Sequence, residues 1–159
     1  MSQEKIGFEQ FIIAVPAEHQ AFIHDLHDFM ADAGCRIAFE EKKSGLLASI
    51  KYGKPPRAVA NFLFRKQGLL VRIYGENIGG YRDFLHTLPT EMVAAIDGSS
   101  TCKRLTENGC SPKCMGYDFE IGDAHFQKCR YGCFEFLVTD KAKPFIRAFV
   151  EKELGERAK

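Results

Sequence analysis

Residues 36–74 read RIAFEEKKSGLLASIKYGKPPRAVANFLFRKQGLLVRIY, and this stretch decides the fold. Apolar positions alternate with polar ones at its start, and turns rich in Gly, Lys and Pro interrupt the later apolar runs. Short strands separated by such turns are typical of an antiparallel meander. Four strands are predicted, over residues 36–40, 46–52, 58–65 and 69–74. The third contains the nearly continuous apolar run VANFLF, so we expect it to be central.

Helical periodicity appears on both sides of the meander. A first helix is predicted over 6–15, and Pro16 then opens a second one that ends at Gly34. In the second helix Phe22, Leu26, Phe29 and Ala33 recur at helical spacing. Further helices are predicted over 81–88, 91–96 and 140–154, and the tail 155–159 is expected to fray.

The order of these elements predicts the fold class. After a cysteine-rich loop, a hairpin is expected over 117–121 and 124–131, and its second strand resumes at 134–138. Strands and helices that are segregated along the chain favour an α+β fold with a mainly antiparallel sheet of about six strands and helices on one face. We expect a single domain over 1–159, with a possible subdomain break near 97–101.

Composition limits the functional classes. The chain has 159 residues, a formal net charge of +1 and 27% charged residues, so it has no overall attraction to nucleic acid or membrane. The apolar run at 11–15 is too short for a signal segment, and no run approaches the length of a membrane span. We therefore expect a cytoplasmic protein, whose thiols stay reduced.

Five of the six cysteines lie within residues 102–133, which points to metal or thiol chemistry. Two pairs have the spacing C-x3-C, at 110–114 and 129–133, and thiolate pairs from two places in a chain are typical of a zinc site. The neighbouring Lys and Arg residues favour thiolate. The predicted ligands of one structural zinc are Cys102, Cys110, Cys114 and Cys129.

Other interpretations of the cysteines stay open. An iron–sulfur cluster, a redox dithiol and unliganded cysteines are alternatives to zinc. Cys133 follows a glycine and precedes a phenylalanine, as expected of a packed core thiol, and Cys35 is interpreted as a buried apolar residue. A catalytic zinc would need an open coordination position and a base, and His125 and Glu120 are the only bases nearby.

A basic segment lies within the meander. Residues 42–75 contain eight Lys and Arg and no acid, whereas residues 1–41 contain eight acids and two bases. Such asymmetry hints at an anionic partner, although Lys and Arg also guard exposed strands and turns. Lys51, Arg65 and Arg72 lie inside strands, so they are the predicted anion-binding residues. The loop 75–80 precedes a helix and is a second candidate for phosphate.

Three segments carry a resemblance. Cys102-Lys-Arg-Leu, Cys114-Met-Gly-Tyr-Asp-Phe and Lys128-Cys-Arg-Tyr resemble a pattern in small uncharacterised bacterial cysteine-containing proteins. The resemblance implies a bacterial source and gives no activity.

Two functions from different classes follow. The favoured one is a zinc-stabilised cytoplasmic binding module for an anionic ligand, either a phosphate-containing small molecule or nucleic acid. The alternative is an enzyme, a thiol oxidoreductase or a zinc-dependent hydrolase that uses the cysteines of residues 102–133. No H-E-x-x-H, G-x-S-x-G, C-x-x-C or dinucleotide-binding fingerprint supports the alternative.

Overall fold

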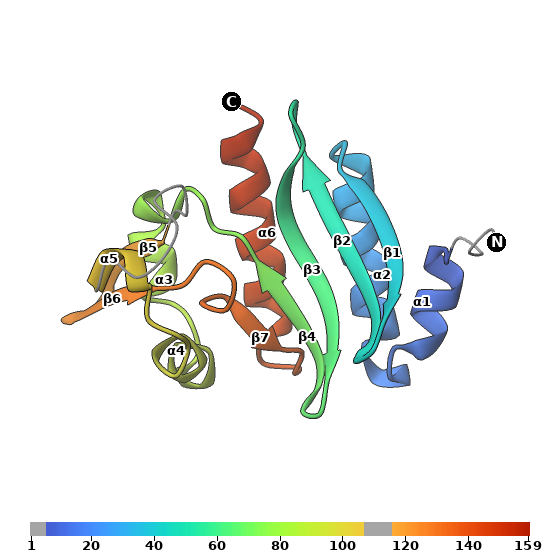
Figure 1. The fold of residues 1–159 in the computed structure, drawn as a ribbon, viewed down its shortest axis with the longest axis horizontal. Helices are drawn as coiled ribbons and strands as arrows, with labels where there is room; N and C mark the ends of the chain where they lie inside the picture. The colour runs from blue at the N-terminus through green and yellow to red at the C-terminus, as the bar shows by residue number, and fades with distance from the viewer. Residues whose placement is uncertain (1–5, 107–115) are drawn as a thin grey trace.

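The computed structural model describes residues 6–106 and 116–159. Its main element is a five-stranded antiparallel sheet in the order β1-β2-β3-β4-β7 (Figure 1). The strands are β1 (Arg36–Lys42), β2 (Gly45–Tyr52), β3 (Arg57–Arg65), β4 (Gly68–Ile73) and β7 (Glu135–Leu137). The α+β class and the antiparallel meander are confirmed, and β3 is the central strand, as its apolar run indicated.

The other two strands form a separate sheet, which corrects the expectation of one sheet with about six strands. β5 (Tyr117–Ile121) and β6 (Ala124–Lys128) pair with each other as a hairpin. β6 ends earlier than predicted because the chain turns there, and the N–H of Cys133 donates to the carbonyl of Cys129 at 3.0 Å. After this turn β7 reaches the meander, where it pairs with β4.

Helices cover one face of the main sheet. Figure 1 shows α2 (Ala17–Asp32) and α6 (Lys143–Arg157) behind the strands, with α1 (Phe8–Ala14) beside β1. Successive side chains of a strand point to opposite faces, so alternate residues of each strand meet these helices. The strand residues of this core are Ala48, Ile50, Ala60, Phe62, Val71, Ile73 and Phe136, all buried. The helices contribute Phe11, Ile23, Leu26, Met30, Ile146, Phe149 and Val150.

Short elements connect the meander to the hairpin. They are the 3-10 turn η1 (Ile78–Gly80) and the helices α3 (Arg82–Leu85), α4 (Thr90–Asp97) and α5 (Lys103–Thr106). The last helix has the predicted length but lies further along the chain, because α6 begins at Lys143 and continues through Arg157, where fraying was expected. No helix in the described ranges is long and apolar enough to cross a membrane.

Figure 1 shows the other face of the main sheet without helices from the described residues. The strand register places Ser49, Asn61, Arg72 and Glu135 in one row across this bare face. A neighbouring row on the same face is apolar and consists of Leu63, Leu70 and Leu137, so this face is polar only in part.

Candidate functional site

Two of the four predicted zinc ligands lie in the described part of the chain, and they are neighbours. The N–H of Cys102 donates to the carbonyl of Gln127, and the N–H of Cys129 donates to the carbonyl of Ser100, both at 2.9 Å. These bonds flank the isolated bridge between Thr101 and Lys128. Cys102 and Cys129 are therefore diagonal neighbours on one side of a short ribbon, where such neighbours are about 7–8 Å apart.

The remaining predicted ligands, Cys110 and Cys114, lie outside the described residues. Gly116, which follows Cys114 by two positions, lies against Cys102. A Cβ atom added to Gly116 would be 2.3 Å from the Cys102 Sγ atom, so only glycine fits here. Within the described ranges, no three Cys, His, Asp or Glu side chains gather as a metal site.

Cys133 and Cys35 have the character of packed thiols. Cys133 is fully buried, and this burial raises the pKa of its thiol well above the usual range. Cys35 is partly buried, and burial raises the pKa of its thiol to about 11. Because the thiolate is the nucleophile, these two residues are poor candidates for the redox cysteine that the enzyme alternative requires.

The three predicted anion-binding residues share the bare face of the sheet, but they do not form one pocket. Lys51 pairs with Ala58 in the strand register, seven residues away from Arg65. At about 3.3 Å per residue, the two positions are about 23 Å apart along β3. The Arg65 guanidinium donates to the Ser44 hydroxyl at 3.1 Å, and Arg72 forms an ion pair with Glu135 at 2.7 Å.

The loop 75–80 does not have the form of a phosphate loop that feeds a long helix. Only η1 and the four-residue α3 follow it. At Gly75, an added Cβ atom would meet the Phe149 ring at 3.1 Å and the Phe134 ring at 3.2 Å. The glycine is needed because two aromatic side chains of the core pack against the backbone there.

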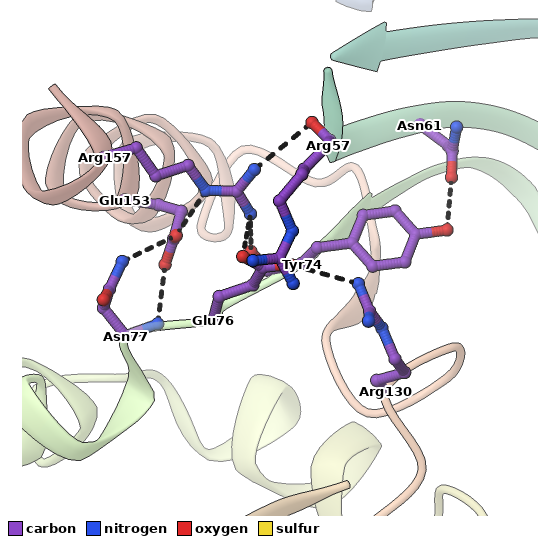
Figure 2. A network of polar contacts seen from close by, with 8 residues as sticks. All are labelled: Arg57, Asn61, Tyr74, Glu76, Asn77, Arg130, Glu153 and Arg157. Atoms are coloured by element: carbon purple, nitrogen blue, oxygen red, sulfur yellow. Dashed lines mark hydrogen bonds and ion pairs between the residues drawn. The ribbon is translucent and has the colours of Figure 1, made fainter. Parts of the chain in front are cut away.

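Arginine side chains gather where β3 begins and β4 ends, as Figure 2 shows. Three guanidinium groups from separate segments surround the Glu76 carboxylate. Arg57 Nη2 is 3.0 Å and Arg130 Nη2 is 3.3 Å from Glu76 Oε1, and Arg157 Nη2 is 3.9 Å from Glu76 Oε2. We call these four residues the arginine cluster. Glu76 is only 13% exposed, whereas the Arg57 side chain is 54% exposed, so solvent reaches the cluster from the Arg57 side.

A second carboxylate, Glu153, lies beneath the arginine cluster and is fully buried. It accepts hydrogen bonds from Arg157 Nε at 2.6 Å, from the Tyr81 hydroxyl at 2.9 Å and from the Asn77 side-chain amide at 3.0 Å. Arg157 also donates to the carbonyls of Tyr74 at 2.8 Å and Arg57 at 3.3 Å. These contacts hold the C-terminal turn of α6 against the ends of β3 and β4, which explains why the tail does not fray.

Arg130 links the cluster to the bare face of the sheet. Its guanidinium lies over the rings of Tyr74 and Tyr131, 5.4 Å and 5.6 Å from their centroids. The Tyr74 hydroxyl donates to the Asn61 side-chain oxygen at 2.8 Å, and Tyr131 is 55% exposed. Two buried donor atoms near this place, Arg130 Nε and the Tyr117 hydroxyl, have no hydrogen-bond partner among the described residues.

A groove of about 270 Å³ lies between β5 and the segment of η1 and α3. It is lined by Ile78, Gly79, Arg82, Leu85, Asp118, Phe119 and Glu120. Asp118 forms a hydrogen bond and ion pair with His125, and this contact, together with the Gln127 amide, lowers the pKa of the carboxyl. Of the two bases named for a catalytic zinc, Glu120 lines this groove and His125 does not, and none of the lining residues is a cysteine.

Sequence patterns indicate little of the arginine cluster. Arg57 belongs to the basic segment, but its neighbours in the sequence suggest a turn. Arg130 stands in the sequence only as a flanking charge for the cysteines, and Arg157 belongs to the tail that is expected to fray. Searches against protein-family models, curated proteins and solved structures find no match for this chain.

Proposed function

We propose that this protein is a binding module for an anionic ligand and that the arginine cluster takes the anion. The observation that carries the proposal is the convergence of Arg57, Arg130 and Arg157 on one carboxylate, Glu76. With Glu153 included, three guanidiniums face two carboxylates, which leaves a surplus of one positive charge. A ligand of the phosphate class fits this surplus, because the planar guanidinium fork matches phosphate oxygens in pairs.

Glu76 has a defined role in this proposal. Its carboxylate occupies the guanidinium donors of Arg57 and Arg130 when no ligand is present, and an incoming anion displaces it. Arg157 stays with the buried Glu153, so the inner part of the network keeps its structure during the exchange. The alternative, a purely structural network, predicts no competition between Glu76 and an external anion.

The test measures binding of inorganic phosphate and pyrophosphate by calorimetry and by thermal stabilisation at low salt. We expect E76Q to bind these anions at least about 10-fold more tightly, because the variant lacks the carboxylate charge that competes for the arginines. R57Q should bind about 10-fold more weakly, since a charged hydrogen bond contributes about 1.5–3 kcal/mol. The matched control is R147Q, which removes an exposed arginine from α6 that pairs with Glu151 at 2.7 Å.

The outcomes separate the two interpretations. If neither the wild type nor E76Q binds the anions, or if R147Q weakens binding as much as R57Q, the cluster is structural and the proposal fails. A nucleic acid ligand would also contact the bare face. In that case a variant of Lys51, Arg65 and Arg72 elutes from heparin at lower salt, with a salt slope that falls by about 0.7–0.9 for each phosphate that the variant no longer neutralises.

The zinc in this proposal is structural. The diagonal placement of Cys102 and Cys129 supports two of the four predicted ligands, and the close approach of Gly116 to Cys102 supports a compact site. A metal held by this region stabilises the turn after β6, which carries Arg130 into the arginine cluster.

A further inference from the structure

Two unpartnered donors sit beside the arginine cluster, and both are buried. They are the Tyr117 hydroxyl and Arg130 Nε, and neither has a hydrogen-bond partner in the described part of the chain. The Tyr117 side chain belongs to a residue only 4% exposed. Buried donors are nearly always paired, so each unpaired one calls for an explanation.

Packing connects the Tyr117 ring to the segment that carries Glu76. The ring centroids of Tyr117 and Phe134 are 5.2 Å apart. Phe134 in turn packs against Gly75, the residue before Glu76. Burial raises the pKa of Tyr117 well above its usual range, and the Arg130 charge is the strongest influence that lowers it. Tyr117 is therefore a neutral hydroxyl donor near the Arg130 guanidinium.

Arg130 Nε can only donate and the Tyr117 hydroxyl is able to donate, so a single acceptor group satisfies both atoms. A cation or an apolar ligand would leave Tyr117 and Arg130 unsatisfied. Arg130 already directs Nη2 to Glu76 Oε1, whereas its buried Nε has no partner among the described residues. A ligand that accepts hydrogen bonds from the Tyr117 hydroxyl, from Arg130 Nε and from the other guanidinium groups needs several acceptor oxygens that point in different directions. A tetrahedral phosphate has this arrangement, whereas the two oxygens of a carboxylate lie in one plane.

We infer that the ligand of the arginine cluster is a phosphate group with one oxygen directed inward, received by the Tyr117 hydroxyl and by Arg130 Nε. The inference rests on the proposed function, because it assigns further contacts within the same site. Among the described residues, the Tyr117 hydroxyl has no hydrogen bond to lose in the free protein, and this property makes its role in binding testable.

The test compares Y117F with the wild type in titrations with inorganic phosphate. The free Y117F protein should melt at the same temperature or higher, because it loses an unpaired buried hydroxyl and keeps the ring. Its affinity for phosphate should fall about 10-fold. The control is Y131F, which removes the hydroxyl of an exposed tyrosine in the adjacent turn and should leave phosphate affinity unchanged.

Each result has one meaning. If Y117F binds phosphate as tightly as the wild type, the Tyr117 hydroxyl does not contact the ligand, and the inference is overturned while the proposed function stands. If the wild type does not bind phosphate, both the inference about Tyr117 and the proposed function are wrong. Should Y117F fail to fold, NMR of wild-type protein labelled at the tyrosine ζ carbon replaces it. The Tyr117 signal should shift when phosphate is added, and an unshifted signal overturns the inference.

Discussion

Replacement of Glu153 by glutamine tests the network beneath the arginine cluster. The substitution keeps the size of the side chain and removes the charge that faces Arg157 Nε at 2.6 Å. Glu153 is fully buried and the Arg157 side chain is only 8% exposed, so water does not replace the lost partner. Loss of one partner from a buried ion pair costs about 3–5 kcal/mol, because the other charge stays buried without compensation.

The structure places E153Q in the lower part of that range. Glu76 Oε2 lies 3.9 Å from Arg157 Nη2 and keeps a partial counter-charge near the guanidinium. We therefore expect the free energy of unfolding to fall by about 3 kcal/mol. A chain of this length melts about 2–4 °C lower for each kcal/mol lost, which gives a decrease of about 6–12 °C.

The control lies on the same helix. Arg147 and Glu151 also form an i,i+4 pair, at 2.7 Å and in the opposite sequence order, but their side chains are 36% and 49% exposed. E151Q should lower the free energy of unfolding by only about 0.3–0.5 kcal/mol. The assay is thermal and urea unfolding followed by circular dichroism, with equal m-values required for the comparison.

Two results test whether burial strengthens the ion pair of Glu153 and Arg157. If E153Q melts within about 2 °C of E151Q, burial does not strengthen the Glu153–Arg157 pair, and the reasoning is refuted. The double variant E153M/R157M removes both charges together. It should recover part of the stability that E153Q loses, since an apolar pair of similar volume leaves no unpaired buried charge.

Four further predictions concern the cysteine-containing regions. G116A should lose about 1–3 kcal/mol of unfolding free energy, because its Cβ atom would overlap Cys102 Sγ, whereas G132A, with open space around the glycine, should lose much less. Cys35 should react with iodoacetamide at pH 8 on the order of 100-fold more slowly than in urea-unfolded protein, because its pKa of about 11 leaves little thiolate. Because this pKa is raised, the stability that Cys35 contributes is fully present below its unfolded pKa and is lost as the pH rises through about 11, a loss that C35A should lack. Protein purified without chelator should carry about one zinc per chain by elemental analysis, and C129S but not C35S should lose it. A metal-free wild type would end the zinc proposal.

Local patterns in the sequence were sufficient for most elements of the fold. Alternation and turn residues in 36–74 predicted four strands in the correct order, and the apolar run of 58–65 identified the central one. Helical spacing predicted α2, and Pro144 in the first turn indicated where α6 lies. These signals are reliable because backbone geometry and side-chain periodicity act over a few residues.

The division into two sheets was decided by tertiary structure. The hairpin of β5 and β6 has the same alternating pattern as the meander strands, so periodicity alone could not tell which strands pair. The turn after Lys128 and the bridge from Thr101 to Lys128 determine that the hairpin stays apart and that β7 joins β4.

The candidate site also could not be predicted from periodicity in the sequence. Arg57 and Arg157 are a hundred positions apart in the sequence, and they meet at Glu76 only because α6 packs across the ends of β3 and β4. The sequence by itself determined the strands, the long helices and the concentration of cysteines. Tertiary structure alone decided which charges are buried together, since a contact between distant side chains leaves no periodic trace along the chain.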